Sequence, residues 1–428
     1  MKNILIISYS APPQNIPSAV RTGKLAKYFK ELGWNPIILT VKNAGFYLND
    51  NTLLDELSDI EIVRTNSLDP QMILKKLRPY KDIEISRKIN KEKEGFISKL
   101  KSIFPIDDKI GWMPFCLKAA SEIIRKHKID AIYTFVGGIN HPGISAYKLS
   151  KKHNIPYFVE FHDLWANHPF FERKIIGQYF NDYWEKKVVK SASGIITLAP
   201  GQKKFLQNKY PFSIGKIIFN LTGFDAELVT FPKHKTDELT ITFCGSLYKN
   251  MTPKNIFDAL LAIDKIEIPI KLKFIGDFRN SFFVLKNQFE NKINNQKIKV
   301  EILHRMTYAN LLLELQKSDA LMLFLPNKEK FKPILHAKLY DYVVAGKPIL
   351  AFVPKNSDVW NFVNDNQLGF VVEADNLENG KNTLTKLIAE YQANDLKKYQ
   401  AKTEFIQKYS RKNVAKKVAE FIEERINE

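Results

Sequence analysis

Residues 4–41 read ILIISYSAPPQNIPSAVRTGKLAKYFKELGWNPIILTV, and this stretch decides the fold class. An apolar run at residues 4–7 precedes a proline-containing loop. A helix is then predicted over about residues 20–32, and Gly33 is a natural residue to end it. A second apolar run, residues 36–41, follows at once. The succession of strand, loop, helix and strand is that of a βαβ unit.

The same succession returns further along the first half of the chain. Three more helices are predicted, over about residues 117–127, 143–153 and 179–190. Each is followed by an apolar run, and these runs are residues 129–133, 157–161 and 194–198. Continuous apolar runs between helices predict parallel strands that are buried on both faces of a sheet.

A polar stretch at residues 232–238 is predicted to be a linker, and after it the pattern starts again. Its apolar runs are residues 241–244, 272–275, 299–303, 320–324 and 348–352. We therefore expect an α/β protein with two doubly wound, Rossmann-like domains at residues 1–231 and 232–410. The amphipathic segment 411–428 is predicted to form a helix that packs back on the first domain.

The composition is that of a globular protein, with 45% hydrophobic and 26% charged residues among 428. The two cysteines, Cys116 and Cys244, predict neither a disulfide framework nor a metal site, and a cytoplasmic location is expected. The apolar run near Met1 is too short for a signal peptide, and no stretch of about 18 apolar residues predicts a membrane span.

The formal net charge is +19. One interpretation is a general bias toward Lys and Asn; the other is attraction to an anionic membrane surface, with the protein peripheral to the inner face of the cytoplasmic membrane. Nucleic acid is not an expected partner, because no binding motif accompanies the charge. Residues 71–101 interleave basic and apolar side chains, which indicates either a membrane- or acceptor-binding segment or a solvated insertion.

Ligands of open parallel sheets bind beyond the carboxyl ends of the strands, so the loops there are candidate sites. Gly245 and Ser246 follow the first strand of the second half, and a glycine lets the backbone approach a ligand closely. A following helix, with Lys249 and Lys254 nearby, would favour a diphosphate. A plain strand-to-helix turn is the alternative. Asp341, in a helix that ends at Gly346, would accept hydrogen bonds from a ribose diol.

In the first half, the run 160–165 places Glu160, His162 and Asp163 directly after a strand. An imidazole and an acid there would orient a sugar hydroxyl or stabilise positive charge on an anomeric carbon. The alternative is that Asp163 caps a helix beside a packed Trp165. His141 follows the loop 137–140 and indicates either an acceptor contact or a simple turn.

The ordered set of motifs resembles the retaining GT-B glycosyltransferases of group 1, or family 4, above all the cell-surface polysaccharide and amino-sugar transferases. Residues 10–13 and 18–21 resemble the family's P-P loop and following Arg. Residues 160–165 resemble D-x-R-D-x-W, residues 218–225 resemble N-G-x-D, and residues 243–247 resemble F-x-G-x-L. Residues 338–350 resemble K-L-x-E-Y-x-x-x-G-K-P-I-L, which is the most specific of these matches.

The resemblance implies two domains facing across a cleft, with a nucleotide-sugar donor, UDP-sugar being expected, on the second domain. The implied donor-binding residues are Gly245, Ser246, Lys249, Lys254, Arg305, Met306, Lys338 and Asp341. The glycan or lipid-linked acceptor would contact the first domain. The implied acceptor-binding residues are Arg21, Glu160 and His141, and the implied catalytic residues are His162 and Asp163.

The resemblance also implies attack from the face of the leaving group, with retention and without a metal or other cofactor. No D-x-D sequence offers the usual metal–diphosphate bridge. The sequence departs from many relatives in carrying Asp341 for the second of two Glu, and Pro333 for the first. An epimerase acting on nucleotide sugars, or a non-catalytic nucleotide- or sugar-binding protein, are the alternatives. Product analysis with the donor alone distinguishes an epimerase from a transferase. Donor hydrolysis that depends on Asp341 excludes a non-catalytic binding protein.

Overall fold

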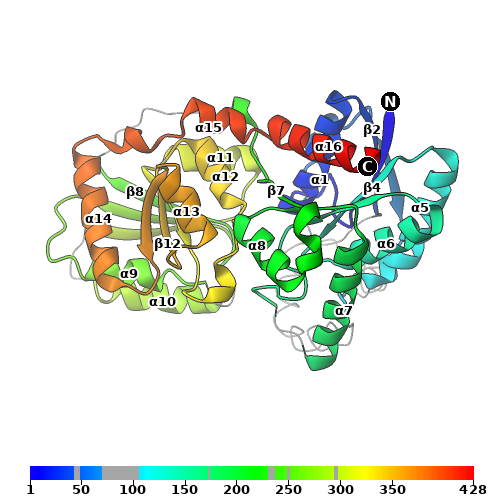
Figure 1. Ribbon diagram of the computed structural model, residues 1–428. Helices are drawn as coiled ribbons and strands as arrows, with labels where there is room; N and C mark the ends of the chain where they lie inside the picture. Colours follow the sequence, from blue (N-terminus) through cyan, green and yellow to red (C-terminus); the bar gives the residue numbers. More distant parts are fainter. Residues whose placement is uncertain (43–48, 70–105, 172–173, 230–236, 248–250, 294–296) are drawn as a thin grey trace. The chain divides into compact units, whose positions relative to one another are not determined.

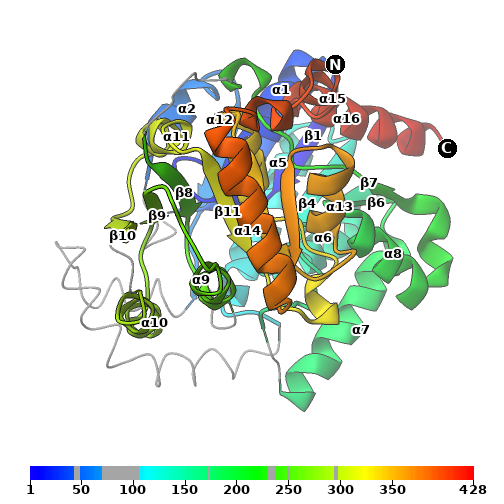
Figure 2. The ribbon, with the colours of Figure 1, turned by 90° about the vertical axis from the view of Figure 1, so that its left-hand side faces the viewer.

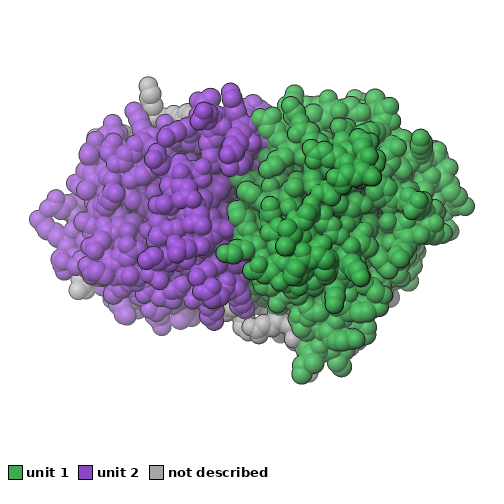
Figure 3. All heavy atoms as spheres, in the orientation of Figure 1, with its two compact units in different colours: residues 1–221, 411–428 green, residues 222–410 purple. Residues whose placement is uncertain are grey.

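The computed structural model describes residues 1–42, 49–69, 106–171, 174–229, 237–247, 251–293 and 297–428. The chain divides into two compact units (Figures 1 and 3). The first consists of Met1–Leu221 with Arg411–Glu428, and the second of Thr222–Ser410. The basic segment 71–101 and Lys249 lie outside the described residues.

The first unit is built on a seven-stranded sheet in which the neighbouring strands are parallel. Its strands are β1 (Lys2–Ile7), β2 (Trp34–Val41), β3 (Glu61–Thr65), β4 (Ala131–Val136), β5 (Tyr157–Phe161), β6 (Gly194–Thr197) and β7 (Ile217–Phe219). The order is β3-β2-β1-β4-β5-β6-β7, so the sheet grows outward in both directions from β1. This reversal between β1 and β4 is the switch point at which doubly wound sheets bind ligands.

Helices cover both faces of this sheet. They are α1 (Pro17–Glu31), α2 (Thr52–Asp55), α5 (Met113–Lys126), α6 (His141–His153), α7 (Ile175–Ser191), α8 (Pro200–Lys209) and α16 (Arg411–Asn427). One core cluster joins Leu5, Ile7 and Leu39 to α5, α6, α7 and α8. The other joins Ile4 and Ile6 to α1 and α16, because successive strand residues point to opposite faces. The C-terminal helix thus packs on the first unit, as the sequence predicts.

The second unit repeats the architecture with a six-stranded parallel sheet. Its strands are β8 (Leu239–Cys244), β9 (Ile270–Ile275), β10 (Ile298–Leu303), β11 (Ala320–Phe324), β12 (Ile349–Val353) and β13 (Gly369–Glu373). The order β10-β9-β8-β11-β12-β13 places the switch point between β8 and β11. The predicted class of two Rossmann-like α/β sheets is therefore confirmed.

The second unit again has helices between and after its strands. They are α9 (Lys254–Leu261), α10 (Asn280–Glu290), α11 (Tyr308–Gln316), α12 (Lys338–Ala345), α13 (Asp358–Asp365), α14 (Leu377–Gln392) and α15 (Thr403–Lys408). Helices α9, α10 and α14 share one phenylalanine-rich core with the strands, and Figure 2 shows α14 lying across the sheet. Helix α13 packs against β12 and β13.

Short 3-10 helices complete the described structure. They are Ile110–Trp112, Pro211–Lys216, Ala226–Leu228, Glu329–Phe331 and Leu396–Tyr399. In the described ranges, none of the helices combines the length and the apolar character needed to cross a lipid bilayer.

Candidate functional site

A buried ion pair lies at the carboxyl end of β5 in the first unit. The Nη2 and Nε atoms of Arg21 donate to the two carboxylate oxygens of Glu160 at 2.7 and 3.0 Å. Both side chains are removed from water, at 4% and 0% exposure. The Tyr133 hydroxyl donates to the same carboxylate at 2.5 Å. The sequence predicts Arg21 and Glu160 as acceptor contacts, and the structure shows that they bind each other.

The environment of Glu160 keeps its carboxyl group ionised. Burial by itself raises the pKa, but the charges and hydrogen bonds of Arg21 and His162 outweigh it and hold the pKa well below the usual range. The pKa of the Tyr133 hydroxyl is raised well above its ordinary value, first by burial and then by the Glu160 charge. Tyr133 therefore stays a neutral hydrogen-bond donor to a carboxylate that is ionised at neutral pH.

His162 takes its orientation from this anion. Its Nε2 atom lies 3.0 Å from Glu160 Oε1, and its ring packs 5.1 Å from that of Phe135. Because an ionised carboxylate only accepts, Nε2 is the donor to Glu160, which leaves Nδ1 as the ring nitrogen that faces other partners. With 18% of its side chain exposed, His162 is the member of the group that solvent or a ligand can reach.

Asp163 packs against Gly137, at a position where only a glycine fits. A Cβ atom on Gly137 would stand 2.3 Å from the backbone nitrogen and oxygen of Asp163, and Gly137 has φ +98°. The Asp163 carboxylate lies 3.5 Å from His168 Nε2 and is 31% exposed. The chain continues in turns, and α7 begins only at Ile175. The alternative that Asp163 caps a helix is therefore wrong.

His141 is buried at the start of α6, where Asp107 holds it. The Asp107 carboxylate accepts from the backbone N–H groups of Asn140 and His141 at 2.8 and 2.9 Å, and lies 2.9 Å from His141 Nδ1. It therefore satisfies N–H groups that a helix start leaves unpaired. The opposite ring nitrogen, Nε2, is buried and has no hydrogen-bond partner among the described residues.

Two glycines bring loops together at the switch point of the second unit. Gly245, after β8, and Gly276, after β9, have φ +103° and +150°, and a Cβ on Gly276 would stand 2.4 Å from the Gly245 carbonyl oxygen. On its other side, Gly245 touches Lys338 of α12: a Cβ on Gly245 would lie 2.7 Å from Lys338 Cε. The absence of side chains at both glycines is what permits this approach.

Lys338 and Asp341 lie on α12, and their charges act on each other. Burial lowers the pKa of Lys338, and the neighbouring Cys244 and Asp341 partly oppose this effect. The Nζ atom of Lys338 also lies 4.9 Å from the centre of the Phe243 ring. Burial and the nearby Lys338 charge lower the pKa of His336 to about 3, so this imidazole is neutral at pH 7.

Asp341 also contacts the loop after β10. The Tyr308 hydroxyl, at the start of α11, donates to Asp341 Oδ1 at 3.2 Å. Arg305 and Met306 precede Tyr308 in the same loop, with Arg305 exposed and Met306 half-buried. The structure thus brings predicted donor residues from three separate segments, near Gly245, Arg305 and Asp341, to one edge of the sheet.

Ser246 and Lys254 are two further predicted donor residues. Ser246 is exposed, and Lys254 is the first residue of α9, where it pairs with Asp258 in the next turn. Sequence reasoning missed Tyr308, Gly276 and Asp107. Gly276 carried a usable signal, since it directly follows an apolar strand. Asp107 and Tyr308 carried none, because their partners are distant in sequence.

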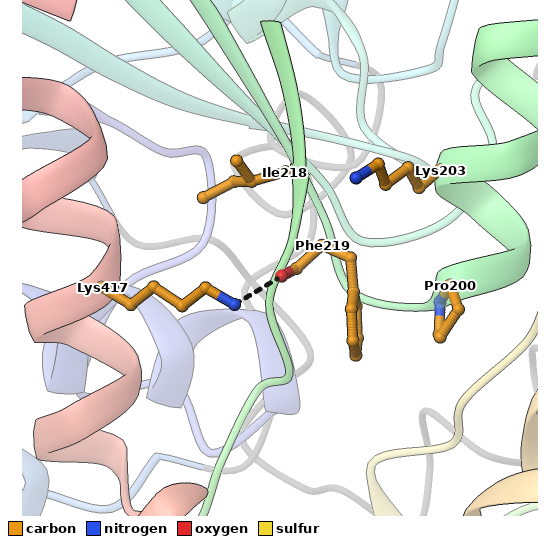
Figure 4. A pocket seen from close by; sticks show the side chains of 5 residues that line it. All are labelled: Pro200, Lys203, Ile218, Phe219 and Lys417. Carbon is orange, nitrogen blue, oxygen red and sulfur yellow. Dashed lines mark hydrogen bonds between the residues drawn. The ribbon is translucent and has the colours of Figure 1, made fainter. Parts of the chain in front are cut away.

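A separate pocket of about 400 Å³ lies in the first unit, beside β7 (Figure 4). It is lined by Pro200, Lys203, Ile218, Phe219 and Lys417. Lys417 donates to the Phe219 carbonyl oxygen at 3.2 Å across its edge. None of the sequence-predicted site residues lines this pocket.

Comparisons with known proteins match both the sequence of the first unit and the whole fold. Residues 19–228 match the family model described as Glycosyltransferase Family 4. None of the curated proteins is similar enough in sequence to match the chain.

Solved structures match over nearly the full length. A glycosyltransferase from Rickettsia africae is 18% identical, with 99% of this chain and 98% of that one covered and a TM-score of 0.64. Sucrose-phosphate synthase from Thermosynechococcus elongatus is 12% identical, with 99% of both chains covered and a TM-score of 0.68. Anabaena HepE in complex with UDP-glucose is 13% identical, with 99% and 100% covered and a TM-score of 0.64. Residues 19–228 are therefore similar in sequence to Glycosyltransferase Family 4, and the chain as a whole shares the GT-B fold of these solved glycosyltransferase structures.

Proposed function

We propose that this protein is a glycosyltransferase that moves a hexosyl or acetamidohexosyl group from a nucleotide-sugar donor to a glycan or lipid-linked acceptor. The donor is a UDP-sugar, and the anomeric configuration is retained. The observation that carries the proposal is the cluster of Lys338, Asp341 and Tyr308 beside Gly245 at the switch point of the second unit. The UDP-glucose complex of HepE, which shares the fold, supports UDP as the nucleotide.

The donor-binding chemistry follows from the charges of this cluster. The Asp341 carboxylate accepts hydrogen bonds from the ribose diol, which has two adjacent donors. Lys338, together with the backbone at Gly245 and Ser246, holds the diphosphate, and Lys249 and Lys254 add positive charge. Arg305 and Met306 contact the base. These cationic and N–H groups stabilise the departing diphosphate without a metal.

The acceptor binds the first unit in this proposal. Arg21 and Glu160 hold the His162 ring, whose Nδ1 accepts a hydrogen bond from a hydroxyl of the acceptor sugar other than the reacting one, and Asp163 helps to orient the sugar. The acceptor oxygen forms its bond to the anomeric carbon on the face from which the diphosphate leaves. The diphosphate departs with the electron pair of the broken C–O bond, and one of its oxygens takes the hydroxyl proton.

The protein acts in cell-surface polysaccharide biosynthesis of a bacterial cell. It works in the cytoplasm and peripherally at the inner face of the membrane, where lipid-linked acceptors are presented. The net charge of +19 supports this location, since the cytoplasmic leaflet carries a negative surface potential.

A thermal-shift screen tests the donor site. UDP and UDP-sugars should stabilise the protein more than GDP or ADP, to the same extent with and without EDTA. Asp341→Asn should weaken UDP binding by roughly 1.5–3 kcal/mol, the cost of losing hydrogen bonds to a charged acceptor. Asp365→Asn, at an exposed position of α13, is the matched control and should bind as the wild type.

Two outcomes would contradict the proposal. If Asp341→Asn bound UDP as tightly as the wild type, Asp341 would not be the residue that contacts the ribose. Conversion of a UDP-sugar to its epimer in the absence of any acceptor would identify an epimerase on the same fold. Slow donor hydrolysis that disappears in Asp341→Asn is the result expected of a transferase.

A further inference from the structure

Helix α7 exposes an unusual number of large apolar side chains. Ile175, Ile176 and Tyr179 are 90%, 72% and 70% exposed, and Phe180 and Tyr183 are exposed as well. Because an α-helix turns once every 3.6 residues, positions 175, 176, 179, 180 and 183 lie on one face. We call these five residues the α7 apolar face. A group of exposed apolar side chains of this kind marks a surface that binds a protein or a membrane.

The inner face of the same helix explains why the apolar face is left outside. Asn181, Glu185, Val188 and Val189 are buried against the first unit. The two acidic residues of α7 are both paired with Lys209 of α8, whose Nζ atom lies 2.7 Å from Asp182 and 2.8 Å from Glu185. The helix is thus anchored through one side, and its opposite side is presented to solvent.

The positive charges of α7 follow the apolar face. Lys186, Lys187 and Lys190 come three, four and seven residues after Tyr183, so they extend the same face toward the C-terminal end of the helix. The Nζ atom of Lys187 lies 4.5 Å from the centre of the Tyr183 ring. Lys174 precedes the helix and is exposed. Cations therefore flank the apolar face, while both acids of the helix are paired with Lys209.

We propose that the α7 apolar face and its lysines dock the protein onto an anionic lipid bilayer. Aliphatic side chains at one end, tyrosines along the face and lysines at its border are the composition of a helix lying in a bilayer interface. Tyrosine suits that depth because its ring is apolar and its hydroxyl is wet. The excess of positive charge favours an anionic membrane over a neutral one.

The inference rests on the proposed function in one respect only, namely that the acceptor is presented at a membrane. The docking surface itself belongs to α7 and shares no residue with the proposed donor site. Lipid binding and UDP binding can therefore be lost independently, and the two proposals can fail separately.

Vesicle co-sedimentation of the full-length protein tests the docking surface. The wild type should bind vesicles of equal parts phosphatidylcholine and phosphatidylglycerol, and should bind phosphatidylcholine alone at least tenfold more weakly. Added salt should weaken the binding to anionic vesicles. The triple variant Ile175→Ser, Ile176→Ser, Tyr179→Ser should lose at least tenfold in vesicle affinity. So should the double variant Lys186→Glu, Lys190→Glu.

Matched controls come from the second unit. Phe283→Ser with Val284→Ser removes exposed apolar side chains of α10, and Lys397→Glu with Lys402→Glu makes the same charge change at other exposed lysines. Both pairs should bind anionic vesicles as the wild type does. UDP-induced thermal stabilisation should be unchanged in all four variants, which also shows that they are folded.

Three results would overturn the inference. The first is a wild type that does not bind anionic vesicles. The second is α7 variants that bind vesicles as well as the wild type. The third is a wild type that self-associates in light scattering and becomes monomeric in the triple variant, which would identify a second copy of this chain as the occupant. Vesicle binding by a protein that shows no response to UDP would instead leave the docking surface standing and remove the proposed donor site.

Discussion

Arg21 and Glu160 form an ion pair that is almost wholly removed from water, and its energetics are those of a buried charge. Replacing one partner leaves the other uncompensated in a low-dielectric interior. Arg21→Met should therefore destabilise the first unit by about 3–5 kcal/mol. Urea denaturation measures the change in the free energy of unfolding. Hydrogen exchange of peptides from β5 measures the loss of protection within the first unit.

Two further variants make this test specific. Lys412→Met breaks an exposed pair with Glu31 and should cost only about 0–1 kcal/mol. Adding Glu160→Gln to Arg21→Met removes the stranded charge and should recover part of the loss. A single variant Arg21→Met as stable as Lys412→Met would show that the pair contributes nothing to the fold.

The free energy of unfolding should depend on pH through the ionisation of Glu160. Its pKa in the folded protein is held below the ordinary value of 4.5, so the unfolded chain takes up the proton first as the pH falls. The stabilisation is fully present above pH 4.5 and is lost as the pH falls through the folded pKa. The stability difference between the wild type and Glu160→Gln should therefore be constant near neutral pH and shrink below about pH 4.5. Parallel curves down to low pH would contradict this assignment.

Single residues show where sequence reasoning stops. The run at residues 160–165 predicts that Glu160 and His162 follow a strand, and they do. It cannot predict that Arg21, from a helix distant in sequence, binds the Glu160 carboxylate, because that contact depends on where α1 lies over the sheet. Asp107 is a similar case: nothing local indicates that it binds the start of α6.

At the scale of elements, the loops after β8 and β9 depend on each other. Gly276→Ala would place a methyl group against the Gly245 backbone, which cannot rotate away as a side chain can. The strained φ alone should cost about 1–3 kcal/mol. The displaced Gly245 loop should also weaken UDP binding, which isothermal titration calorimetry measures.

Gly138→Ala is the matched control for this prediction. Gly138 has φ +127°, yet a Cβ there would meet no atom within 4 Å. Gly138→Ala should therefore introduce backbone strain without a steric clash. Because Gly138 lies in the first unit, the affinity for UDP should stay that of the wild type. Equal UDP affinity in Gly276→Ala would show that the two loops do not form one donor site.

Four helices begin earlier than predicted, and three of them have a proline in the first turn. The fourth, α7, begins at Ile175 instead of about residue 179 and has no proline there. The helices predicted at about residues 20, 117 and 143 begin at Pro17, Met113 and His141. Each has a proline at its first or second position, where the missing N–H is not needed. The apolar periodicity begins later than the helix does, because the first turn is set by the backbone and not by the core.

At the scale of the whole molecule, the last helix belongs to the first unit. Phe421 of α16 packs against Phe158 of β5, with ring centres 6.2 Å apart, and against Gly194 of β6. Phe421→Ala should destabilise the first unit by about 3–5 kcal/mol. Hydrogen exchange should become faster in β5, β6 and α1 and stay unchanged in the sheet of the second unit.

Phe352→Ala gives the reciprocal measurement. Phe352 is buried in β12, in the core of the second unit. The change should accelerate exchange in that sheet and leave α1 and β5 unaffected. Loss of protection throughout the chain in both variants would mean that the two units unfold as one cooperative body.

The sequence by itself determined the parallel sheets, since continuous apolar runs alternating with helices are buried on both faces of a parallel sheet that helices cover. It also determined which loops carry polar side chains at the carboxyl ends of the strands. Tertiary structure alone decided the contacts: Arg21 on Glu160, Tyr308 on Asp341, Gly276 on Gly245, and the outward side of α7. The physical reason is that hydrophobic periodicity is a local property of the chain. The partner of a charge or a glycine depends instead on how distant segments are packed.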